Sequence, residues 1–177
     1  MNLPRRLQQW EALTLKVGAE LHLDPALLLA IMDRESQGGE SLDPPGPGGV
    51  GDKGNGLGLM QLDRRYAGRA LLPGDAWKDP ETNIRAGARE LRKNLDRLHG
   101  DVAAAVAAFN VSLDHILRAQ AQMKPDATLE ERVHAFDAFT MGCDYVADVL
   151  ERREAFSRPD NDPDFGDIVM GRSAATG

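Results

Sequence analysis

The chain has 177 residues, of which 42% are hydrophobic and 28% charged, a composition that fits one globular domain with its own core. Its formal net charge of −7 argues against a general nucleic-acid binder, whose surface usually carries a basic patch. No uncharged apolar stretch approaches the roughly 18 residues that predict a membrane span. Because Cys143 is the single cysteine, no disulfide can form within the chain.

The first two predicted elements are helices. An apolar stripe with helical spacing, Leu3–Leu21, predicts one helix that ends near His22. Asp24 and Pro25 then supply an N-cap and a first-turn proline for a second, nearly all-apolar helix over residues 26–35. We expect this second helix to belong to the core.

Glu35 ends the second helix, on the face that carries buried side chains. It follows Ile31 by four residues and Met32 by three, and these spacings share one helical face. Burial disfavours the ionised carboxyl group, and the negative end of the helix dipole acts in the same direction, so we expect a raised pKa. A general acid requires a raised pKa, and Glu35 is therefore a candidate for that role.

A glycine- and proline-rich segment, residues 36–57, follows the second helix and predicts a long loop with short hairpin strands. It leads into the segment Gly51–Asp63, which holds two further carboxylates, Asp52 and Asp63. A loop of this length inside a domain is usually functional or disordered, and its place between three carboxylates favours a function. Alternatively, Asp63 caps the turn that follows it.

The rest of the domain is predicted to be helical. The expected helices cover residues 79–98, 101–110 and 112–123, a helix that starts with the capping box Thr128–Glu131, and residues 136–156, which Gly142 can interrupt. The small residues of 101–110 predict a buried central helix. Residues 1–157 are thus expected to form one domain, and the polar, proline-broken residues 158–177 a flexible tail.

Four segments together resemble goose-type lysozymes and the related soluble lytic transglycosylases. Glu35-Ser36 is similar to the family's catalytic pair, and Gly51–Asp63 follows its glycine-rich signature nearly residue for residue. Ala107–Asn110 resembles an alanine-tyrosine-asparagine motif with Phe109 in place of the tyrosine, and Asp144–Val149 resembles a late tyrosine motif. The resemblance implies a mainly α, lysozyme-like α+β fold with the Gly/Pro-rich loop or a small β-hairpin over the active-site cleft.

The resemblance also implies cleavage of the β-1,4 bond between N-acetylmuramic acid and N-acetylglucosamine in peptidoglycan. Glu35 would protonate the leaving oxygen. An inverting hydrolase needs a second carboxylate, roughly 6.5–9.5 Å away, to hold the attacking water, and Asp52 and Asp63 are the candidates. A lytic transglycosylase would use the glutamate alone and give 1,6-anhydro-muramic products. A third possibility is a non-catalytic wall-binding or assembly protein with a degenerate cleft.

The expected substrate contacts lie around the same segments. They are Ser36, Asn55, Gly58, Gln61, Asn110 and Tyr145. A glycine backbone allows a sugar ring to approach closely, and the Gln61 amide suits an N-acetyl group. Asn55 is either a turn residue or a ligand contact, and Asn110 is expected to brace the glycine-rich loop. Tyr145 is expected to bond Glu35 and tune its proton, or else to fill the core.

No cofactor is expected, because the four histidines lack metal-ligand spacing and Cys143 has no second thiol. We expect a monomer that acts on peptidoglycan strands rather than on nucleic acid or membranes, with a carrier or immunity protein as a further potential partner. The first residues are not expected to act as a signal peptide, and we therefore expect synthesis in the cytoplasm. Delivery to the wall would then follow lysis, a holin or injection, as for a phage enzyme or a bacterial antibacterial effector.

Overall fold

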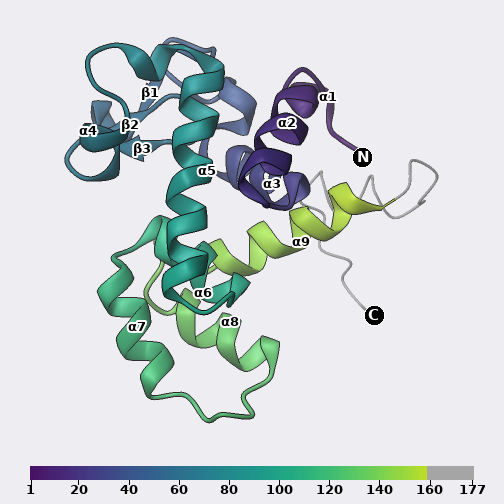
Figure 1. Cartoon of the computed structure of the whole chain (residues 1–177), viewed down its shortest axis with the longest axis vertical. Helices are drawn as coiled ribbons and strands as arrows, with labels where there is room; N and C mark the ends of the chain where they lie inside the picture. The colour runs from purple at the N-terminus through teal and green to yellow at the C-terminus, as the bar shows by residue number, and fades with distance from the viewer. Residues whose placement is uncertain (159–177) are drawn as a thin grey trace.

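Helices make up most of the structure, a computed structural model that describes residues 1–158 (Figure 1). In chain order the elements are α1 (Arg5–Gln8), α2 (Glu11–Leu21), α3 (Pro25–Ser36), η1 (Gln37–Gly39), β1 (Val50–Gly51), η2 (Asp52–Gly54), β2 (Gly56–Leu57), β3 (Leu62–Asp63), α4 (Ala67–Leu71), η3 (Ala76–Lys78), α5 (Pro80–Arg97), α6 (Val102–Asn110), α7 (Leu113–Ala121), α8 (Leu129–Asp137) and α9 (Tyr145–Ser157). Within residues 1–158, no helix combines the length and apolar character needed to cross a membrane. The predicted tail lies, apart from its first residue, outside the described residues.

Side-chain caps start several of these helices where the sequence predicts them. Asp24 accepts a hydrogen bond from the backbone of the first turn of α3, at 2.9 Å, and Asp79 does so for α5, at 2.8 Å. Thr128 and Glu131 form the expected reciprocal capping box at the start of α8. Each cap satisfies backbone N–H groups that a helix N-terminus leaves without partners, which fixes where the helix begins.

The N-terminal stripe forms two helices, so the prediction of one helix over Leu3–Leu21 is wrong. The chain turns between α1 and α2, and the Trp10 indole N–H donates to the carbonyl of Gly38 at 2.9 Å. Leu7 in α1 and Trp10 in the turn are both buried. Because the turn keeps the apolar residues on the inner side, the stripe continues through it and gives no sign of the break.

The last predicted helix is also interrupted. α8 ends at Asp137 and α9 begins at Tyr145, with Gly142 at a positive φ of 88° in the connection. The buried Asp137 carboxylate accepts hydrogen bonds from the backbone N–H groups of Val146 (2.7 Å) and Ala147 (3.0 Å). The end of α8 therefore caps the start of α9, which holds the two helices at a defined angle.

The core is organised around two apolar helices. α6 is buried along Ala103–Ala107, as expected for the central helix, and packs against α5, α7, α8 and α9. α3 is buried along Ala26–Met32 and packs against α2 and α9. α5 links the sheet end of the molecule to the end formed by α6, α7 and α8 (Figure 1). Gly87 on α5 leaves room for the Met60 side chain, since a Cβ at position 87 would lie 2.7 Å from the Met60 Cγ.

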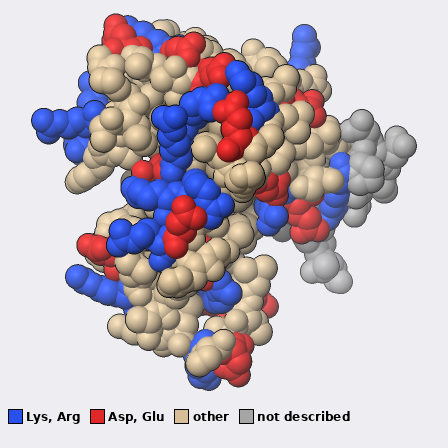
Figure 2. All heavy atoms as spheres, viewed as in Figure 1, with Lys and Arg blue, Asp and Glu red and all other residues tan. Residues whose placement is uncertain are grey.

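A small antiparallel sheet of three strands, in the order β1-β2-β3, lies beside α4 (Figure 1). Gly51 pairs with Gly56, and Gly56 pairs with Asp63, so two glycines and an aspartate lie side by side across the strands. The sheet confirms the short hairpin strands predicted for this segment. On the face shown in Figure 2, Lys and Arg side chains lie interspersed with Asp and Glu, although the net charge of the chain is −7.

Candidate active site

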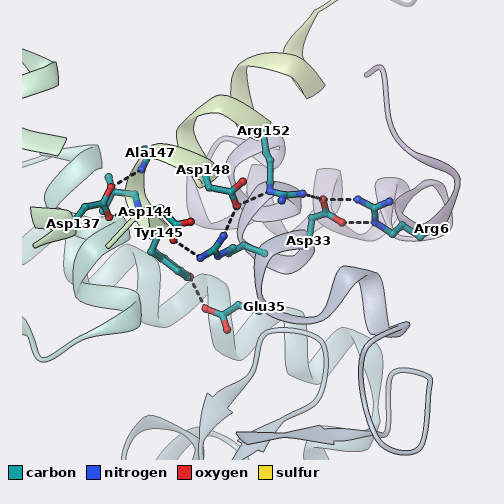
Figure 3. A network of polar contacts seen from close by, with 11 residues as sticks. Arg6, Asp33, Glu35, Asp137, Asp144, Tyr145, Ala147, Asp148 and Arg152 are labelled. Atoms are coloured by element: carbon teal, nitrogen blue, oxygen red, sulfur yellow. Dashed lines mark hydrogen bonds and ion pairs between the residues drawn. The ribbon is translucent and has the colours of Figure 1, made fainter. Parts of the chain in front are cut away.

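The Glu35 carboxyl group lies in the last turn of α3 and meets a side chain from α9. The Tyr145 hydroxyl donates to its Oε1 at 2.5 Å (Figure 3). Burial raises the pKa of Glu35 to about 7, although the Tyr145 hydrogen bond and the nearby Arg34 charge both act to lower it. Part of the side chain remains accessible to solvent. Near neutral pH this carboxyl group can therefore either release or accept a proton.

Tyr145 occupies this position because α9 is fixed at its first turn. The ring is 2% exposed, and its backbone precedes the two N–H groups that Asp137 caps. Burial, followed by the adjacent Glu35 charge, raises the pKa of Tyr145 well above 10. The hydroxyl is thus protonated across the physiological range and acts as a hydrogen-bond donor to Glu35. The contact expected between these two residues is present.

Arg34, next to Glu35, extends toward the same end of α9. Its Nη2 donates to Asp144 at 2.6 Å and its Nη1 to Asp148 at 3.2 Å (Figure 3). The guanidinium carbon lies 5.7 Å from the centre of the Tyr145 ring. Arg34 is not among the site residues predicted from the sequence, although an arginine next to a candidate acid is a signal that could have been used.

A second arginine continues this group of ion pairs into the interior. Arg152 bonds Asp148 at 2.8 Å and also pairs with Asp33, whose side chain is fully buried. Arg6 from α1 completes the group with a bond to Asp33 at 2.6 Å (Figure 3). The charges of the six residues Arg6, Asp33, Arg152, Asp148, Arg34 and Asp144 alternate along the chain of contacts. A buried aspartate with two arginine partners avoids the cost of an unpaired buried charge.

The two aspartates of the glycine-rich segment share one arginine. Arg65 contacts Asp63 through its backbone N–H (2.7 Å) and its guanidinium (2.5 Å from Nη2), and these contacts lower the pKa of Asp63. The same Nη2 lies 3.6 Å from the Asp52 carboxylate, whose side chain is 61% exposed. Both carboxylates are therefore held close together, Asp63 firmly and Asp52 loosely. The backbone bond to Asp63 also agrees with the alternative that it caps a turn.

The Gln61 side chain lies against the paired glycines of the sheet, Gly51 and Gly56. Its Nε2 donates to the carbonyl of Gly58 at 2.7 Å. A Cβ atom on either Gly51 or Gly56 would lie 2.1 Å from the Gln61 Oε1, so a side chain at either position would displace the amide. The paired glycines thus make room for Gln61, a local structural role beside the expected contact with sugar.

Hydrogen bonds to two helices fix the following part of the segment. The buried side chain of Asn83, on α5, accepts from the N–H of Met60 (2.8 Å) and donates to the carbonyl of Leu57 (2.9 Å). Gly58, at a φ of 63°, leaves no room for a Cβ beside the Asn83 amide, 2.5 Å away. The fully buried Ser36 hydroxyl bonds the carbonyl of Leu59 at 2.7 Å. Ser36 and Gly58 therefore brace the segment, whereas the sequence predicts substrate contacts for them.

The remaining predicted residues also take part in local structure. Asn55 donates to the carbonyl of Asp52 at 3.1 Å, which fits its alternative role as a turn residue. Asn110 accepts from the N–H of Met141 at 3.1 Å and so braces the connection between α8 and α9, not the glycine-rich loop as predicted. Within residues 1–158 the structure thus joins Glu35 to Tyr145 and Asp52 to Asp63. Asn83 and Asp137, which hold these pairs in place, were missed, since a single polar residue in a helix gives no pattern.

A sequence model of a known family covers nearly all of this arrangement. The model described as Lysozyme g matches residues 3–159, from the turn before α1 to just beyond α9. The chain belongs to the lysozyme g family. The match includes α3 with Glu35, α9 with Tyr145, and the glycine-rich segment that carries Asp52 and Asp63.

Individual relatives agree with this assignment. A lysozyme g of Gallus gallus is 29% identical over 161 residues, which are 86% of this chain and 65% of the chicken protein. A lysozyme g of Struthio camelus is 48% identical over 59 residues, or 33% of this chain and 27% of that protein. A protein of Enterobacteria phage PRD1 named transglycosylase is 39% identical over 104 residues, or 59% of this chain and 35% of the phage protein. The chain therefore spans less than two thirds of the length of each of these relatives.

The fold also matches a solved structure. An X-ray structure of an inactive mutant of the lytic transglycosylase Slt from Pseudomonas aeruginosa aligns with a TM-score of 0.68 and 20% identity. The alignment covers 87% of this chain and 26% of that protein. At this identity the likeness concerns the fold alone, and it confirms the mainly α, lysozyme-like α+β fold.

Proposed function

We propose that this protein cleaves the β-1,4 bond between N-acetylmuramic acid and N-acetylglucosamine in peptidoglycan, with Glu35 as the general acid. The observation that carries the proposal is the Glu35 carboxyl group itself, whose pKa is raised to about 7 at an accessible position beside Tyr145. A general acid works best when its pKa lies near the operating pH. Membership of the lysozyme g family supports the same reaction.

Protonated Glu35 donates its proton to the glycosidic oxygen as the bond to the leaving sugar breaks. The carboxylate that results keeps the Tyr145 hydroxyl as a hydrogen-bond donor, 2.5 Å from Oε1. A hydrogen bond to the charged form stabilises it, so Tyr145 limits how far burial raises the pKa of Glu35. Tyr145 thus lets the acid give up its proton near neutral pH.

For the second half of the reaction, we assign Asp52 to hold the attacking water. Its carboxylate is exposed and meets Arg65 at 3.6 Å, so its oxygens remain free to accept hydrogen bonds from water. Asp63 is bound by the backbone and the guanidinium of Arg65, which makes it the residue that orients Arg65. Activation of water by a carboxylate opposite the acid is the arrangement of an inverting hydrolase.

A lytic transglycosylase is the second candidate. The specific observation in its favour is the phage PRD1 protein named transglycosylase, which is 39% identical over 104 residues of this chain. In that reaction the sugar closes on its own hydroxyl group, and Asp52 would have no water to hold. A wall-binding protein without activity is the third candidate, but the raised pKa of Glu35 has no use in binding alone.

Substrate contacts would then come from side-chain amides that the fold leaves partly exposed. The Asn110 carboxamide uses its oxygen for the N–H of Met141, and its NH₂ group is a potential donor to a sugar. Gln61 uses its NH₂ group for Gly58, and its side chain is partly exposed on the sheet. We therefore assign sugar contacts to these two amides rather than to the buried Ser36.

Mass spectrometry of purified sacculi after digestion tests the proposal. The wild-type protein should release fragments with reducing N-acetylmuramic ends, and Glu35→Gln should release none. Asp52→Asn should abolish most hydrolysis, whereas Asp63→Asn should retain part of it because Asp52 remains. Asp96→Asn, which changes an exposed ion pair on α5, is the matched control and should cleave like the wild type.

Two results would contradict the hydrolase. Exclusively 1,6-anhydro-muramic ends, with Asp52→Asn as active as the wild type, would identify a lytic transglycosylase. Equal and negligible release by the wild type and by Glu35→Gln would identify a non-catalytic protein.

A further inference from the structure

We propose that Asp144 and Asp148 are positioning residues, which hold the Arg34 guanidinium on α9 and so keep it from forming an ion pair with Glu35. The inference rests on the proposed function, because it concerns how the general acid remains available. It assigns a role in that site to three charged residues that do not touch the reacting atoms.

Arg34 and Glu35 lie close together. They are consecutive in the last turn of α3, and both side chains bond residues at the start of α9, Arg34 with Asp144 and Glu35 with Tyr145. The Arg34 guanidinium carbon lies 5.7 Å from the centre of the Tyr145 ring, while the hydroxyl of that ring bonds Glu35 at 2.5 Å. An arginine side chain has several rotatable bonds, so a guanidinium released from α9 can reach the carboxylate.

An ion pair between Arg34 and Glu35 would lower the pKa of Glu35. A cation in contact with a carboxyl group favours its ionised form. Even at its present position, Arg34 lowers the pKa of Glu35, against the larger effect of burial. A direct contact would strengthen this effect, and a glutamate ionised at neutral pH has no proton to donate.

Two aspartates at the start of α9, Asp144 and Asp148, hold the Arg34 guanidinium. Asp144 directly precedes Tyr145 and Asp148 follows it by three residues, so both carboxylates flank the tyrosine that bonds Glu35. The Asp148 carboxylate also bonds Arg152 at 2.8 Å, and Arg152 pairs with the buried Asp33. Asp148 is therefore oriented from the interior of the protein, and its position does not depend on Arg34 alone.

Other charged groups on the neighbouring elements are engaged elsewhere. The charged residues of α2, which packs against α3, pair away from the site: Glu11 with the Met1 amine, Lys16 with Glu81, and Glu20 with Arg85. Asp52 and Asp63 both face Arg65. Among residues 1–158, Arg34 is the cation that acts on the charge of Glu35.

The double variant Asp144→Asn/Asp148→Asn tests the inference, with the Glu35 carboxyl group followed by NMR titration. The midpoint of the Glu35 titration should fall by about one pH unit or more, since an arginine next to a carboxyl group lowers its pKa by roughly 1–3 units. The alkaline limb of sacculus cleavage should move down by the same amount. A merely structural role would lower cleavage at every pH and leave the limb in place.

A triple variant, with Arg34→Gln added, tests whether Arg34 is the group that lowers the Glu35 midpoint. Its Glu35 midpoint should return to the wild-type value or above, because the cation is gone. An unchanged midpoint in the double variant, or a lowered midpoint that persists in the triple variant, overturns the inference. Asp96→Asn is again the matched control and should leave the midpoint unchanged.

A single variant and the independence of the titration from activity cover the remaining outcomes. If the double variant does not fold, the single variant Asp144→Asn, at a position with a 59% exposed side chain, should show a smaller shift in the same direction, and no shift overturns the inference. The NMR titration needs no activity. Failure of cleavage in the wild type would therefore refute the proposed function without touching the titration result.

Discussion

Replacing Glu35 by glutamine should change how the stability of the protein depends on pH. Wild-type Glu35 has a pKa of about 7 in the folded protein, against 4.5 for an ordinary glutamate. The folded state therefore binds this proton more tightly than the unfolded state. The resulting stabilisation is fully present below pH 4.5, and it is lost as the pH rises through 7.

The size of this effect follows from the two pKa values. A rise from 4.5 to about 7, at about 1.4 kcal/mol for each pH unit, corresponds to about 3.5 kcal/mol. Because solvent reaches part of the side chain, we expect about 2–3 kcal/mol. Glutamine cannot ionise, so the variant lacks this contribution at every pH.

Urea unfolding of both proteins between pH 4 and pH 9 measures the difference. The free energy of unfolding of the wild type, minus that of Glu35→Gln, should fall by about 2–3 kcal/mol across this range. Most of the fall should occur between pH 4.5 and 7.5. Parallel curves would show that Glu35 titrates alike in the folded and unfolded states, and would refute the reasoning that makes it a general acid.

Three other variants probe the residues that hold the site together. Asn83→Ala removes both bonds to the glycine-rich segment and should lower the free energy of unfolding by about 2–4 kcal/mol; a loss below about 1 kcal/mol in urea unfolding would contradict this. Gly56→Ala should displace the Gln61 amide and lower the free energy of unfolding, and adding Gln61→Ala should recover part of the loss. Losses that simply add in the double variant would contradict this. Asp137→Ala should free the first turn of α9 and weaken the Tyr145–Glu35 bond, seen as a raised Glu35 midpoint in NMR titration; an unchanged midpoint would contradict it.

Features that rest on neighbouring residues could be predicted from the sequence. The Asp24 and Asp79 caps, the Thr128 capping box and the buried alanines of α6 each follow from a pattern of a few consecutive residues. The burial of Glu35 follows from its spacing to the apolar residues of its own helix. In all these cases the determining contacts lie within one turn or one helix, where sequence spacing fixes distance.

Features that depend on contacts between distant residues could not. The break at Trp10 is stabilised by the carbonyl of Gly38, 28 residues away. Asn83 bonds the glycine-rich segment across 23 and 26 residues. The Arg65 guanidinium lies 3.6 Å from the carboxylate of Asp52, 13 residues earlier in the chain. Nothing in the local sequence around such a residue tells whether its side chain meets solvent, substrate or protein.

The bond between Glu35 and Tyr145 joins positions 110 residues apart, and this separation has a consequence for the timing of synthesis. At 5–20 residues per second, a ribosome needs on the order of 10 s to add the residues between them. Until α9 has left the ribosome and docked on α3, Glu35 has neither its tyrosine nor the aspartates that hold Arg34. A nascent or prematurely terminated chain therefore contains Glu35 without the Tyr145 hydrogen bond and without the aspartates that hold Arg34. The complete site forms only after the whole domain has been synthesised and folded.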